Sequence, residues 1–223
     1  MWQTLYEDLK SHNFVVLAIA MDVPEAARPW IDAAKPSYPC LVDSDHHVAD
    51  LYDMINVPQA VWIDEAGRMV RPPENAGAAD TVRFFDPKTG ALPADKLAER
   101  ARTKAAYVEA VRDWVLKGAA SEHVLDDATA RTRMRLPNDD IAVAHARFRL
   151  GQYLMRAGKA DEAARHFAMA SRLHPDSWNI WRQAAAKDAT GLAATSEFWD
   201  RVASLGDRPY HMPVQISGLS APE

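Results

Sequence analysis

A single cysteine, Cys40, is the chain's one candidate for thiol chemistry. One thiol cannot form an internal disulfide, and it cannot supply the Cys-x-x-Cys pair that attacks and then resolves a protein disulfide. No basic residue stands close to Cys40 in the sequence, although His46 and His47 could approach it in space. Its neighbours Pro39 and Leu41 favour a small buried hydrophobe over a resolving or sensor thiol.

Histidines and acidic residues gather around position 46 and raise the question of a metal site. His46 and His47 are adjacent, with acidic residues on both sides. Neighbouring residues on a helix point about 100° apart, so they do not share a ligand sphere well. A helix that begins here with Ser44 or Asp45 as its N-cap explains the pattern better. We therefore expect no metal site and no cofactor, and the chain carries neither a glycine-rich phosphate loop nor a His-Glu-x-x-His helix.

The composition is that of an ordinary globular protein, with 48% hydrophobic and 26% charged residues. A net charge of −5 argues against a nucleic-acid-binding surface, which is usually basic. The longest apolar run, Phe14–Met21, has the length of a strand and is too short to span a membrane. Residues 1–7 lack the basic start of a secretion signal, which predicts a cytoplasmic location for the chain as written.

Alternating helix and strand patterns predict an α/β domain over residues 1–120. An amphipathic helix at residues 2–10 precedes the apolar run Phe14–Met21, which is typical of a strand buried on both faces of a parallel sheet. The later elements are expected to be a helix from Pro24, a short extended piece at 38–43, a helix at 45–54, a strand at 60–64, a glycine turn, and a strand at 69–71 that Pro72 and Pro73 end.

This order, with a Val-Pro turn before the strand at 60–64, resembles the thioredoxin fold. The closer resemblance is to its redoxin branch, the thiol-specific antioxidant and TlpA/ResA-like proteins, and its most specific part is Asn-Val-Pro-Gln-Ala-Val-Trp-Ile-Asp-Glu-Ala-Gly at residues 56–67. Members of this family place a cis proline beside the redox cysteines, and Pro58 takes that position. The resemblance implies thiol–disulfide exchange with protein substrates, and it implies that the backbone of Val57 would meet a substrate peptide.

The chain departs from this family at its start. The family's redox cysteines open the helix that precedes the strand at 14–21, and here that helix is already under way at Met1. We expect an N-terminally truncated thiol–disulfide oxidoreductase or peroxiredoxin-like protein; the other explanation is a gene that has lost its redox end. A missing upstream signal would place the protein outside the cytoplasm. The family's central strand is also missing, so open sheet edges predict a poorly stable or oligomeric chain.

The second half of the chain is expected to be helical. A long amphipathic helix is predicted at 93–118, followed by a tetratricopeptide-like helical domain at 139–205 and a tail at 206–223. One 34-residue repeat fits at 144–177, with its matching positions at Leu150, Gly151, Ala163, Phe167, Ala170 and Pro175. A second copy from Trp178 is degenerate. These helices would either form a peptide-binding groove or pack as an appendage against the first domain.

Three functional interpretations follow. The leading one is an incomplete thioredoxin-like protein of the thiol–disulfide oxidoreductase lineage, which lacks the cysteine pair and is inactive alone. The alternative is a non-catalytic module that holds a protein partner through the Val57–Pro58 edge and the helical groove. The third is a one-cysteine peroxidase that uses Cys40.

Overall fold

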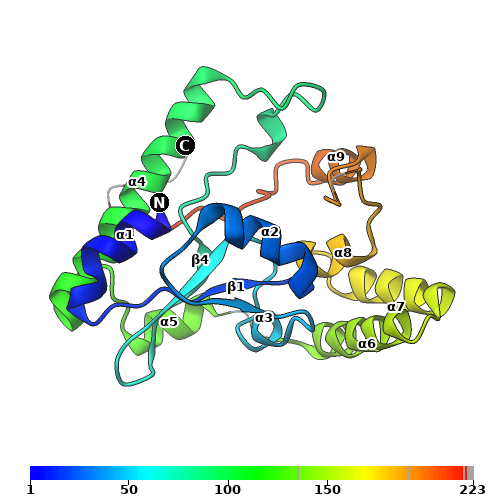
Figure 1. Cartoon of the computed structure of the whole chain (residues 1–223), viewed down its shortest axis with the longest axis horizontal. Helices are drawn as coiled ribbons and strands as arrows, with labels where there is room; N and C mark the ends of the chain where they lie inside the picture. The colour runs from blue at the N-terminus through cyan, green and yellow to red at the C-terminus, as the bar shows by residue number, and fades with distance from the viewer. Residues whose placement is uncertain (135, 190, 218, 220–223) are drawn as a thin grey trace.

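The chain forms a mixed α/β structure in which two small sheets lie among helices (Figure 1). This computed structural model describes residues 1–219 apart from 135, 190 and 218. The first elements follow the expected order. They are α1 (Trp2–Leu9), β1 (Ala18–Ala20), α2 (Pro24–Ala34), β2 (Cys40–Val42), α3 (His47–Leu51), β3 (Gln59–Ile63) and β4 (Met69–Asn75).

The four strands form two separate pairs. β1 runs parallel to β2, with Ala18 opposite Cys40, and β3 runs antiparallel to β4, with Ile63 opposite Met69. Within residues 1–134, all of which the structure describes, no further strand joins either pair. Each pair therefore stands as its own two-stranded sheet within this range.

The expectation that residues 14–21 are buried on both faces was wrong. Only residues 18–20 form a strand, and Val15, Leu17 and Ile19 are 54%, 56% and 38% exposed. The side chains of β2 are similarly uncovered, since Leu41 is 48% exposed. An apolar run predicts burial only where other layers cover it, and the β1–β2 pair is incompletely covered.

Strand β4 continues through Pro72 and Pro73 instead of ending at them. The reason is a bulge in its pairing with β3: Ala60 lies opposite Glu74, whereas Trp62 lies opposite Arg71. The two prolines fall in this irregular stretch, where a missing N–H group costs no regular ladder hydrogen bond.

Helix α3 is shorter than expected, and Asp43 provides its cap. The Asp43 carboxylate accepts hydrogen bonds from the backbone N–H groups of residues 47–49 at 2.7, 2.9 and 3.2 Å. The prediction of Ser44 or Asp45 as the cap was wrong, because His46 adopts a left-handed conformation (φ 56°) that turns the chain just before the helix. Capping by a carboxylate satisfies N–H groups that the first turn leaves without partners.

The core of the first segment forms where α4 (Ala94–Lys117) packs against α1 and β3. Trp62 and Tyr107 lie at its centre, and the Trp62 indole donates a hydrogen bond of 2.9 Å to the Tyr107 hydroxyl. Val214 and Ile216 from the far end of the chain are buried in the same core. The segment after residue 206 therefore returns to the first half of the molecule.

The second half consists of helices α5 (Asp127–Arg133), α6 (Asp139–Arg156), α7 (Ala160–Leu173), α8 (Trp178–Ala184) and α9 (Ser196–Ala203). α6 and α7 pack side by side (Figure 1) around Phe148 and Phe167. Gly151 permits this approach, because a Cβ atom there would lie 2.8 Å from the Phe167 ring. Among the described residues no helix is long and apolar enough to cross a membrane.

Candidate functional site

Cys40 lies at the start of β2, and its thiol is half-buried. Its Sγ donates a hydrogen bond of 3.8 Å to the Tyr38 carbonyl. His46, which the sequence offered as a neighbour for the thiol, is only 2% exposed and packs its ring against Phe148 of α6 at 5.1 Å. Burial lowers the pKa of His46 despite the acidic residues around it. Cys40 thus occupies a strand, whereas reactive cysteines gain their character at helix N-termini or beside cations.

Val57 and Pro58 lie immediately before β3, and both are exposed. The peptide bond between them is cis. The Pro58 carbonyl accepts a hydrogen bond of 3.2 Å from the N–H group of Ala76 just beyond β4. The Val57 N–H group donates to the side-chain oxygen of Asn56 at 2.9 Å. A peptide that paired with this N–H group would have to displace the Asn56 carboxamide.

The second half of the chain holds this loop in place through Asn56, which is 4% exposed. Its carboxamide donates to the Tyr210 carbonyl at 3.1 Å and accepts from the Arg182 guanidinium at 2.9 Å. Asn179 of α8 adds two hydrogen bonds to the loop, to the carbonyls of Ile55 at 3.1 Å and Met54 at 2.7 Å. The helical half is therefore part of the environment of the Val57–Pro58 loop.

One half-buried and two buried ionisable groups surround this anchor, namely Arg182, Tyr210 and His211. Burial lowers the pKa of Arg182 and raises the pKa of Tyr210, whose hydroxyl accepts a hydrogen bond from Arg182. Burial, together with the positive charges of Arg182 and Arg100, lowers the pKa of His211 to about 4. His211 is therefore neutral at neutral pH, because a protonated imidazole would be repelled by the Arg182 guanidinium.

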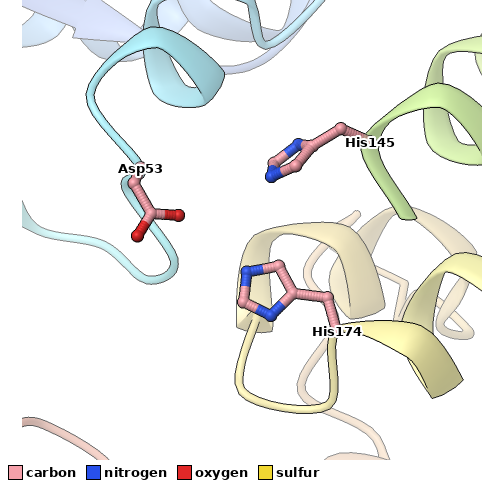
Figure 2. Close-up of side chains that lie close together, drawn as sticks. All are labelled: Asp53, His145 and His174. Carbon is pink, nitrogen blue, oxygen red and sulfur yellow. The ribbon is translucent and has the colours of Figure 1, made fainter. Parts of the chain in front are cut away.

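A second cluster lies where the loop after α3 meets the helical half. It consists of Asp53, His145 of α6 and His174 at the end of α7, and one potential ligand atom from each lies within 4.8 Å of the others. Figure 2 shows the Asp53 carboxylate and the two imidazole rings directed into the same space. The ring centroids of the two histidines are 5.8 Å apart. Two imidazoles and a carboxylate are groups that can hold a metal ion.

Asp50 supports this cluster from one side. His145 Nδ1 lies 2.8 Å from Asp50 Oδ1, and the Arg149 guanidinium donates two hydrogen bonds to Asp50 Oδ2 at 3.0 and 2.8 Å. Burial alone would raise the pKa of Asp50, but its contacts with His145 and Arg149 outweigh that effect and lower it. Asp50 therefore stays ionised and can fix the His145 ring.

Sequence reasoning missed this cluster because its members are far apart along the chain. It weighed His46 and His47, which are adjacent, and it placed residues 144–177 in a helical repeat. No local spacing links Asp53 to His145 or His174, so only the packing of α3, α6 and α7 reveals the group.

Residues 2–71 match the model of the AhpC/TSA family, a redoxin family with the thioredoxin fold. The matched range runs from α1 into β4 and is about a third of the 223-residue chain. Comparison with the curated proteins found no match, and comparison with the solved structures found none either. The first segment is therefore similar to redoxins, and the chain's single cysteine is consistent with the lack of a redox pair.

Proposed function

We propose that the chain is a scaffold of the thiol–disulfide oxidoreductase lineage that performs no dithiol exchange by itself. One observation carries the proposal: the segment similar to redoxins contains a single cysteine, and that cysteine opens a strand. In a dithiol cycle, a first thiolate attacks a disulfide sulfur and expels one thiolate, and a second thiol then displaces the substrate from the mixed disulfide. Cys40 can perform the first step only.

Reaction with glutathione disulfide tests this proposal by stoichiometry. A dithiol protein releases two glutathione thiols per chain and closes an internal disulfide, whereas a single thiol releases one and keeps the other glutathione as an adduct. We expect at most one released thiol per chain, with any adduct confined to Cys40 in the intact mass, and none for Cys40→Ser. Release of two thiols per chain would contradict the proposal.

The interaction-module alternative rests on the exposure of the Val57–Pro58 loop, where Val57 is 44% exposed. Its support is smaller, because the Val57 N–H group already donates to Asn56. A protein partner captured equally well by the native chain and by Cys40→Ala, and lost on Val57→Pro, would favour it. The one-cysteine peroxidase would instead require peroxide consumption that disappears in Cys40→Ser.

A further inference from the structure

We propose that Asp53, His145 and His174 form a binding site for a divalent transition-metal ion, with Zn²⁺ as its occupant. This inference is independent of the proposed function, because none of the three residues takes part in thiol chemistry. It rests on the convergence of three metal-binding groups from three elements that are far apart in the sequence. His174 is 3% exposed and the His145 side chain is 21% exposed, so the cluster is more enclosed than a chance grouping on the surface.

The spacing of the three groups is close to what zinc requires. With bonds of roughly 2.0–2.1 Å, two ligand atoms of a tetrahedral Zn²⁺ ion lie roughly 3.3 Å apart. The three candidate ligand atoms all lie within 4.8 Å of one another. Rotation of the side chains covers the remaining difference, because Asp53 and His145 are half-buried and have room to adjust.

The surroundings of His145 match those of a metal-binding histidine. Its Nδ1 is 2.8 Å from Asp50, and Figure 2 shows its other ring nitrogen directed toward Asp53 and His174. Metal-binding histidines commonly direct the second ring nitrogen to a carboxylate, which fixes the tautomer and the orientation of the ring. Asp50 fills that position and is itself held by Arg149.

The donor set selects the class of ion. Imidazole nitrogens suit zinc and its neighbours among the transition metals, whereas Mg²⁺ and Ca²⁺ prefer ligands that are all oxygen. Three protein ligands leave a fourth tetrahedral position for water or an external group. Because the ligands come from the loop after α3, from α6 and from the end of α7, a bound ion would join the redoxin-like segment to the helical half.

The experiment uses the full chain carrying Cys40→Ser, so that no thiol contributes to metal binding. After treatment with a chelator, the protein is titrated with ZnCl₂ by calorimetry and with CoCl₂ by visible absorption. We expect one Zn²⁺ per chain with micromolar or tighter affinity, visible bands typical of low-symmetry Co²⁺, and a Tm that rises by several degrees with Zn²⁺ but not with Mg²⁺.

Conservative variants locate the site. Asp53→Asn, His145→Gln and His174→Gln should each weaken Zn²⁺ binding at least tenfold. His47→Ala removes an exposed histidine outside the cluster and should leave the affinity unchanged. Circular dichroism confirms that each variant is folded before the titration. The proposal is overturned if the parent chain binds neither Zn²⁺ nor Co²⁺, or if folded Asp53→Asn and His145→Gln bind as tightly as the parent.

Discussion

At the scale of single residues, Asn56 determines how the Val57–Pro58 loop is presented. Its carboxamide oxygen accepts hydrogen bonds from the Val57 N–H group and the Arg182 guanidinium, and its NH₂ group donates one to the Tyr210 carbonyl. The family resemblance points to Val57 and Pro58 but not to Asn56, because Arg182 and Tyr210 lie more than a hundred residues away from it in the sequence. A local motif identifies a loop, whereas its anchors depend on tertiary packing.

Asn56→Ala should lower the free energy of unfolding by roughly 1–3 kcal/mol, because it leaves buried groups of Arg182 and Tyr210 without a partner. Urea unfolding followed by circular dichroism measures the change. Gln3→Ala, which removes solvent-exposed hydrogen bonds of a half-buried side chain, is the control and should cost less than about 0.5 kcal/mol. Equal losses in the two variants would show that Asn56 does not anchor the loop.

His211 should make the chain less stable in acid. Its pKa falls from 6.5 to about 4 on folding, so between these values the unfolded chain binds a proton that the folded chain does not. Stability is therefore complete above pH 6.5 and declines as the pH falls toward about 4, by on the order of 3 kcal/mol. His211→Gln should flatten the profile measured by urea unfolding across this window. The control is His12→Gln, at an exposed histidine, whose stability should depend on pH as that of the native chain does. The account would be refuted if the stability of His211→Gln showed the same pH dependence as that of His12→Gln.

At the scale of elements, the order of helices and strands was predictable because periodicity, capping and turn residues are local signals. Residues 2–10, 60–64 and 93–118 were correctly expected to form a helix, a strand and a long helix. The burial of β1 was not predictable in the same way, because it depends on which strands and helices cover it. Likewise, Pro72 signals the end of a strand only if pairing is regular, and the bulge opposite β3 removes that condition.

Gly151→Ala should destabilise the α6–α7 pair, because the new methyl group would lie 2.8 Å from the ring of Phe167. We expect a loss of about 1–3 kcal/mol in thermal or urea unfolding, as for other overpacked cores. In a chain that already carries Phe167→Leu, and so lacks the ring, adding Gly151→Ala should cost less stability than it does in the native chain. The control is Ala157→Gly, a change between small residues at the end of α6. Gly158→Ala is unsuitable as a control, because Gly158 has a positive φ of 74° that would strain an alanine. A stability for Gly151→Ala equal to that of the native chain would contradict the close packing.

At the scale of the whole molecule, the two halves are joined through the loops around α3. Arg149 of α6 binds Asp50, Gln152 donates to the Ser44 carbonyl at 3.2 Å, and α8 holds residues 54–56. This contact creates the Asp53–His145–His174 cluster. Sequence patterns alone did not indicate it, because they describe each half separately.

Exposed apolar side chains on the β1–β2 pair should make the chain self-associate. Leu17 and Leu41 are 56% and 48% exposed, and no strand among the described residues pairs with the outer edges of β1 and β2. Size-exclusion chromatography with light scattering should give an average mass that rises above that of one chain with concentration. Leu17→Lys should reduce this rise, whereas Leu136→Lys, at an exposed leucine outside the sheets, should not. A sharp monomer peak at every concentration would disprove the expectation.

The most direct test of the central claim is turnover in the reduction of insulin by dithiothreitol. A chain with a single thiol cannot complete the exchange cycle, so the rate should equal the uncatalysed background and should be the same for the native chain and Cys40→Ser. A rate well above background that is lost in Cys40→Ser would contradict the claim and make this chain a working oxidoreductase.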